Sequence, residues 1–145
     1  MITITVLNGP NLGSLGHREP EVYGDVTAFE LEESLREFGG KLGCKVEFSR
    51  HETQGGLTEA ISAASGVSEG LIINPGAFSH TSVAVMDAMR AFQGPVIEVH
   101  ISQIHRREPF RHRMLTAMGA DVVISGAGTR GYISAMEIIM ELLRR

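Results

Sequence analysis

The chain has little of what several protein classes require. Its 145 residues include one cysteine, Cys44, and no tryptophan. A single cysteine excludes a disulfide framework and a zinc site built from several thiolates. The apolar runs are short, as in residues 70–73, whereas a transmembrane helix needs about 20 apolar residues in succession. The first residues carry neither a basic segment nor a signal-peptide cleavage pattern, so we expect a cytoplasmic protein that binds no membrane.

An excess of positive charge is also missing. The chain has 13 lysine and arginine residues against 17 acidic residues, a net charge of −4, which argues against general nucleic-acid binding. The charges are unevenly placed, because residues 19–37 are mainly acidic and residues 100–113 hold four arginines and three histidines. Almost all the cations are arginines, whose planar guanidinium groups bind carboxylates in a two-pronged manner. A small anionic ligand is therefore worth considering.

Short apolar runs alternate with helical patterns along the whole chain. Strands are predicted at residues 2–7, 44–48, 71–73, 96–99 and 122–125, and helices near 28–38, 57–64, 85–92, 110–118 and 133–143. Continuous apolar strands indicate a sheet covered on both faces. We therefore predict an α/β fold: a flavodoxin-like three-layer sandwich with a five-stranded parallel sheet of order 2-1-3-4-5. Residues 1–145 are expected to form a single domain.

Polar residues cluster where the predicted strands end. In such a sheet, ligands bind beyond the carboxyl ends of the strands, at the point where the strand order reverses. The 16-residue loop 9–24 is long for a connection at that edge, which suggests a lid. A strand-end asparagine is more often a turn residue than a ligand contact, but the cluster as a whole favours a site. Its members are Asn8, Asn11, Asn74, His80, Glu98, His100 and Ser102.

Two residue pairs carry possible acid–base chemistry. Glu98 and His100 share a face if the strand stays regular, so they form either a surface ion pair or a general acid held by its carboxylate. Tyr23 follows Arg18 by five residues, and a nearby guanidinium favours a phenolate. On spacing alone, a packing tyrosine and a solvated arginine are the preferred interpretation of that pair.

Two further motifs receive simpler explanations. The pattern Gly126-x-Gly128-x-x-Gly131 resembles a dinucleotide fingerprint, but too few residues follow it to complete the binding unit, so a tight turn with close helix packing is preferred. His100 and His105 with Glu98 form no dense ligand set, so we expect no metal site.

Several motifs together resemble the type II 3-dehydroquinate dehydratases of the shikimate and quinate pathways, over nearly the whole chain. The matching segments are residues 7–12, 15–24, 74–77, 80–84, 98–102, 107–111 and 131–132. The resemblance implies a lyase that converts 3-dehydroquinate to 3-dehydroshikimate through an enolate, with no metal, no cofactor and no Schiff base.

The resemblance also implies a role for each matching residue. Tyr23 would be the base, with Arg18 favouring its ionised form. His100 would be the acid, oriented by Glu98, and Asn11 would help to stabilise the enolate, through a water molecule. The implied substrate-binding groups are Asn74, Ala77, His80, Arg107, Arg111 and the backbone amides of Ile101 and Ser102.

The same resemblance implies an assembly. The family forms homododecamers, tetramers of trimers, and Asp87 matches an acidic residue that completes the site of a neighbouring subunit. Three segments depart from the family pattern: Gly13 stands in the first part of the long loop, Phe78-Ser79 replaces a common Tyr-Thr before His80, and residues 50–55 read Arg-His-Glu-Thr-Gln-Gly. Because of the altered segment, a non-catalytic sensor of a cyclic hydroxy acid is a second hypothesis. A flavodoxin-like nucleotide or flavin binder is a third.

Overall fold

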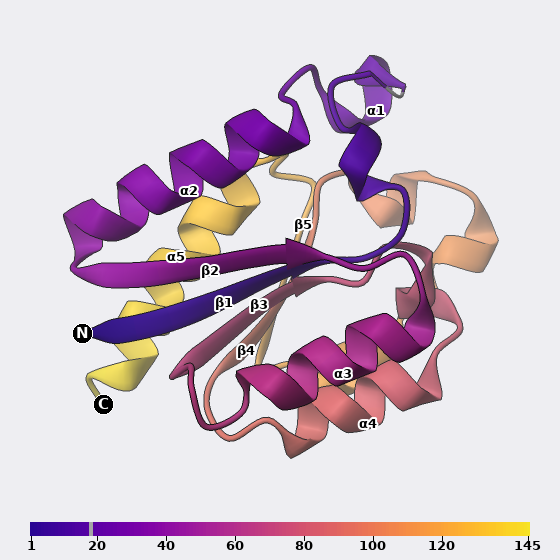
Figure 1. Ribbon diagram of the computed structural model, residues 1–145. Coiled ribbons are helices and arrows are strands. Elements are labelled where there is room, and N and C mark those ends of the chain that lie inside the picture. The colour runs from indigo at the N-terminus through magenta and orange to yellow at the C-terminus, as the bar shows by residue number, and fades with distance from the viewer. Residues whose placement is uncertain (18) are drawn as a thin grey trace.

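A five-stranded parallel sheet forms the centre of the molecule (Figure 1). The computed structural model describes residues 1–17 and 19–145. The strands run in the order β2-β1-β3-β4-β5 and every neighbouring pair is parallel, as the sequence predicts. Their bounds are β1 Ile2–Asn8, β2 Cys44–Arg50, β3 Gly70–Asn74, β4 Val96–His100 and β5 Val122–Ser125.

Helices cover both faces of this sheet. Helices α2 (Ala28–Leu42) and α5 (Arg130–Leu143) lie on one face, and α3 (Gln54–Ala64) and α4 (Val83–Ala91) lie on the other (Figure 1). Successive strand side chains point to opposite faces. Ile72 accordingly packs in the core under α2 and α5, whereas Leu71 and Ile73 pack in the core under α3 and α4. The structure thus has the three predicted layers.

The prediction of a helix over residues 110–118 is wrong. The chain between β4 and β5 instead forms short 3-10 turns at Ile104–Arg106, Pro109–Arg111 and Thr116–Gly119. Phe110 and Met118, the apolar residues that suggested a helix, are exposed, so no apolar stripe holds a helix against the sheet. The long loop after β1 contains a one-turn helix that the sequence did not predict, α1 (Pro20–Tyr23).

Buried polar residues mark one edge of the sheet. All five residues of β3 and all five of β4 are buried, although each strand ends in a polar residue, Asn74 and His100. The register pairs Asn8 with Asn74 and His100 with Ser125, so the carboxyl ends of these strands lie side by side. Both chain termini lie at the opposite end of the sheet (Figure 1). In the described part of the chain, no helix is long and apolar enough to cross a membrane.

The chain leaves β1 through a glycine that permits a close backbone approach. The Gly9 N–H donates to the Asn74 carbonyl at 2.7 Å. A Cβ atom on Gly9 would lie 2.4 Å from the Pro75 carbonyl oxygen, which is closer than van der Waals contact allows. Only glycine therefore lets the ends of β1 and β3 meet in this way.

Gly9→Ala is expected to lower the free energy of unfolding by about 2 kcal/mol, because the backbone at Pro75 must shift to admit the methyl group. Gly40→Ala is the matched control, since Gly40 lies within α2 and a Cβ there meets nothing within 4 Å. That control should gain about 1 kcal/mol from helix propensity. Urea unfolding measures both values, and a Gly9→Ala midpoint equal to that of the parent protein would contradict the assignment.

Candidate active site

A cavity of about 180 Å³ opens at the carboxyl ends of β1, β3 and β4. It brings together most of the residues predicted for a site, including both members of the proposed acid–base pair. Its walls are formed by Pro10, Asn11, Leu12, Tyr23, Asn74, Gly76, Ala77, His80, His100, Ile101, Ser102, Ile104, Arg107 and Arg111. The strand-end rule therefore located the cavity correctly.

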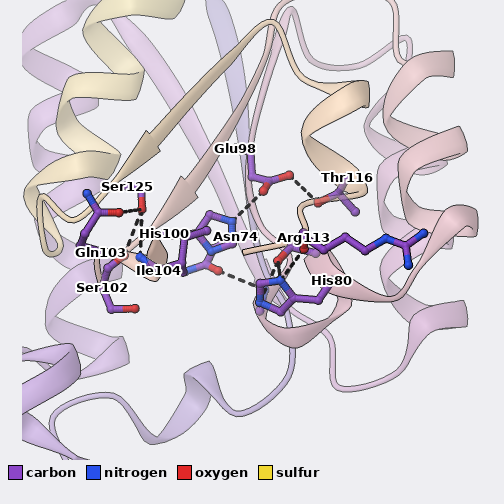
Figure 2. Close-up of polar contacts among 12 residues, drawn as sticks. Asn74, His80, Glu98, His100, Ser102, Gln103, Ile104, Arg113, Thr116 and Ser125 are labelled. Atoms are coloured by element: carbon purple, nitrogen blue, oxygen red, sulfur yellow. Dashed lines mark hydrogen bonds and ion pairs between the residues drawn. The ribbon is translucent and has the colours of Figure 1, made fainter. Parts of the chain in front are cut away.

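His100 is held from behind by a fully buried carboxylate. Its Nε2 lies 2.6 Å from Glu98 Oε2, and the Thr116 hydroxyl donates to Glu98 Oε1 at 2.5 Å (Figure 2). Glu98 and Thr116 are 0% exposed and His100 is 5% exposed, so the surface ion pair considered from the sequence is excluded. With Nε2 engaged, Nδ1 is the ring nitrogen that can serve a ligand in the cavity.

Thr116 was not predicted from the sequence. It lies 18 residues after Glu98, in a turn that had been assigned to a helix. The sequence could have pointed to such a residue only indirectly, because a buried carboxylate has two oxygens and needs a hydrogen-bond donor for each.

Thr116→Val keeps the side-chain shape but removes the donor, which leaves one Glu98 oxygen unpaired in the core. We expect the free energy of unfolding to fall by about 2 kcal/mol, typical of a hydrogen bond to a charged group. Thr116→Ser, which keeps the hydroxyl, should restore most of the loss in a urea titration. Equal stabilities of the valine and serine variants would show that the hydroxyl bond contributes nothing.

Tyr23 has an arginine beside its hydroxyl. Arg107 Nη1 donates to Tyr23 Oη at 2.9 Å and to Ser102 Oγ at 3.3 Å. The guanidinium carbon also lies 5.3 Å from the centre of the tyrosine ring. Sequence spacing suggested Arg18 as the cation near Tyr23, and Arg18 lies outside the described residues. The contact with Arg107, 84 positions away, could not be read from spacing.

Asn74 makes a turn contact and also lies in the cavity wall. Its Oδ1 accepts from the Gly76 N–H at 3.1 Å, which is a turn contact. Its Nδ2 donates to the buried Tyr132 hydroxyl at 3.0 Å, and the residue also lines the cavity. Tyr132 belongs to a segment singled out in the sequence, but no role was predicted for it.

His80 and Arg111 stand at another wall of the cavity. His80 Nδ1 lies 2.8 Å from the Arg113 carbonyl, which can only accept, so Nδ1 carries a proton (Figure 2). Burial lowers the pKa of His80, and the bond to Arg113 opposes that shift in part. A neutral His80 has Nε2 as an acceptor, suited to a hydroxyl group. Arg111 forms an ion pair with Glu108 at 3.2 Å and also lines the cavity.

The lowered pKa of His80 predicts a pH dependence of stability. At a pH between the lowered pKa of His80 in the folded protein and its pKa near 6.5 in the unfolded chain, the unfolded chain binds more protons than the folded protein. The contribution of His80 to the free energy of unfolding is therefore complete above about pH 6.5, and it declines as the pH falls below that value. His80→Gln should flatten the fall in unfolding free energy between about pH 6.5 and 5. A slope as steep as that of the parent protein, measured by urea titration at each pH, would argue against a neutral His80.

Asn11 is held at the cavity by the segment that follows β2. Its backbone is left-handed (φ 67°), a conformation that asparagine tolerates better than most residues. Glu52 Oε2 accepts from the Asn11 N–H at 2.9 Å, and the His51 N–H donates to the Asn8 carbonyl at 2.9 Å. A Cβ atom at Gly13 would lie 3.1 Å from Arg50 Nε, so the glycine makes room for this guanidinium.

Other predicted residues lie away from the cavity wall. Asp87 is exposed on α4, and it does not line the cavity of its own chain. The Gly126–Gly131 motif forms the turn between β5 and α5, where a Cβ on Gly131 would be within 3.4 Å of Val99 and Ile124. That close packing confirms the simpler explanation of the motif. Across residues 1–17 and 19–145, no group of three His, Cys, Asp or Glu side chains could hold a metal ion.

Comparisons with known proteins agree with this geometry. The family model described as dehydroquinase class II matches residues 2–140. The chain is 49% identical over 142 residues to a protein of Bartonella tribocorum named 3-dehydroquinate dehydratase, covering 98% of this chain and 95% of that one. It is 46% identical over 145 residues to 3-dehydroquinate dehydratase 2 of Agrobacterium fabrum, covering 100% and 99% of the two chains.

Solved structures give the same result. The type II dehydroquinase from Propionibacterium acnes superposes with a TM-score of 0.94 at 39% identity, over 97% of each chain. The type II dehydroquinase from Butyrivibrio crossotus also gives a TM-score of 0.94, at 35% identity, over 96% of this chain and 97% of that one.

Proposed function

Because the chain belongs to the class II dehydroquinase family, whose model spans residues 2–140, we propose that it removes water from 3-dehydroquinate to give 3-dehydroshikimate. Residues 1–145 act as one catalytic domain in this proposal. The observation that carries it is a single cavity lined both by Tyr23, hydrogen-bonded to a guanidinium, and by His100, bonded to a buried carboxylate. Such a pair suits a base and an acid that act on one small ligand.

Tyr23 removes the proton from C2 of the substrate. A phenol is a weak base at neutral pH, so the phenolate needs stabilisation. The charge-assisted hydrogen bond from Arg107 at 2.9 Å supplies it, and we assign Arg18 to the same task on the strength of the family motif. The electron pair left on carbon becomes an enolate on the C3 carbonyl oxygen. Asn11, in the cavity wall, stabilises that oxygen through a water molecule.

His100 completes the elimination. Its imidazolium, stabilised by Glu98, gives the Nδ1 proton to the departing C1 hydroxyl. The C1–O bond breaks, water leaves, and the enolate electrons form the C1–C2 double bond. One proton is removed by Tyr23 and one is given by His100, so the elimination releases one water molecule with no net change in protons on the enzyme pair. As the family resemblance implies, the proposed reaction uses no metal, no cofactor and no Schiff base.

The remaining cavity residues bind the substrate. Asn74 and the backbone amides of Ile101 and Ser102 receive the carboxylate, beside Ala77. His80 accepts a hydrogen bond from a ring hydroxyl, and Arg111 donates to another. Arg107 supports the site through Tyr23 and Ser102.

Asp87 belongs to the proposed assembly. We infer that it reaches the cavity of a neighbouring subunit in a homododecamer built as a tetramer of trimers, a role that its exposed position on α4 permits. The proposed partners are the small-molecule substrate and copies of the chain, with no nucleic acid and no membrane. The proposed location is the cytoplasm.

The purified protein should generate the ultraviolet absorbance of a conjugated enone when mixed with 3-dehydroquinate, with a chelator present. Tyr23→Phe and His100→Ala should each lower kcat at least about 100-fold, the usual contribution of a positioned acid or base. His105→Ala is the matched control, because His105 is exposed and does not line the cavity. Circular dichroism checks that each variant is folded.

Two outcomes would contradict the proposal. Substrate binding without turnover in the parent protein would support the sensor hypothesis instead. Near-normal kcat in the folded Tyr23→Phe or His100→Ala variant would remove the role assigned to that residue.

A further inference from the structure

A buried hydrogen-bond chain behind the cavity links helix α5 to Asn74. The Tyr132 hydroxyl lies 2.7 Å from Asn8 Oδ1 and 3.0 Å from Asn74 Nδ2. Asn8, Tyr132 and Asn74 are 1%, 0% and 3% exposed, and they come from the end of β1, the first turns of α5 and the end of β3. Tyr132 does not itself line the cavity.

The direction of every proton in this chain follows from one backbone group. The Gly76 N–H can only donate, so the Asn74 atom 3.1 Å from it must be the carbonyl oxygen. The amide nitrogen of Asn74 therefore faces the Tyr132 hydroxyl and donates to it. Tyr132 must then give its single proton to Asn8 Oδ1. Burial raises the pKa of Tyr132 far above its usual value, so the hydroxyl keeps that proton.

The chain leaves one Asn74 donor unused. An amide nitrogen carries two N–H bonds, and Tyr132 accepts one of them. Since Asn74 lines the cavity, the second N–H is available to a ligand there. The wall consequently offers a donor at this point, which suits an anionic oxygen and disfavours a hydroxyl proton.

We infer that Tyr132 is a positioning residue that fixes the Asn74 amide so that an N–H group meets the ligand carboxylate. This inference rests on the proposed function, since it concerns the carboxylate subsite of the same cavity. A phenylalanine would fill the space equally well, so packing alone does not explain the hydroxyl. Tyr132 therefore contributes to recognition of the ligand carboxylate, and other residues carry out the proton transfers.

The test compares the binding of 3-dehydroshikimate with that of its methyl ester by calorimetry. In the parent protein, the acid should bind more tightly than the ester. Tyr132→Phe should weaken acid binding about tenfold and leave ester binding nearly unchanged. Asn74→Ala and the double variant should bind the acid equally weakly, because Tyr132 acts through Asn74.

Ser68→Ala is the matched control. Ser68 forms a buried hydroxyl pair with Thr5 at 2.5 Å, and neither residue lines the cavity. Its loss should reduce stability without changing the preference for acid over ester. If Tyr132→Phe does not fold, Asn8→Ala removes the acceptor at the end of the chain and should shift the preference in the same direction.

Two results for the variants would overturn the inference: an acid preference that Tyr132→Phe leaves unchanged, which includes an equal loss for acid and ester, or effects of Tyr132→Phe and Asn74→Ala that add. A parent protein without acid preference would also overturn it. The enone assay on the parent protein tests the proposed function separately. If the parent protein turns over 3-dehydroquinate but Tyr132→Phe keeps the same preference for acid over ester, only the role of Tyr132 is wrong.

Discussion

The buried charge of Glu98 constrains the rest of the site. A carboxylate removed from water is tolerated only when both of its oxygens receive hydrogen bonds. His100 from the same strand and Thr116 from the following connection meet that need. Among the described residues, no buried side-chain nitrogen or oxygen lacks a partner. The imidazole is therefore fixed in place by its Nε2 contact with Glu98.

The two halves of the site rest on different kinds of support. His100 and Asn74 are carried by fully buried strands in the centre of the sheet. Tyr23 and Asn11 stand on the loop after β1, where Asn11 and Glu19 adopt left-handed backbone conformations. Arg107 links the two halves, because its side chain contacts both Tyr23 of the loop and Ser102, which follows β4. Packing of the loop residues Leu12 and Leu15 in the core under α2 and α5 adds to this link.

Local patterns in the sequence accounted for the strands and for the strand-end part of the cavity wall. The likeness to a known fold gave the strand order, and the family resemblance added Ala77, Ile101, Arg107 and Arg111 to the wall. Apolar runs mark β3 and β4 directly, and their terminal polar residues mark the edge where Asn74 and His100 lie. The false helix at 110–118 came from apolar residues that turn out to be exposed. Thr116, Tyr132 and the Arg107–Tyr23 pair escaped prediction because each acts across a long sequence separation, which periodicity does not report.

Gly13 and Arg50 lie against each other although they are far apart in the sequence. The guanidinium occupies space that a side chain at position 13 would claim, since a methyl group there would come within 3.2 Å of three guanidinium atoms. A side chain at position 13 therefore fits only if the exposed Arg50 side chain moves aside or is shortened. A smaller residue at position 50 asks nothing of position 13, so the order of the two replacements decides whether each is tolerated.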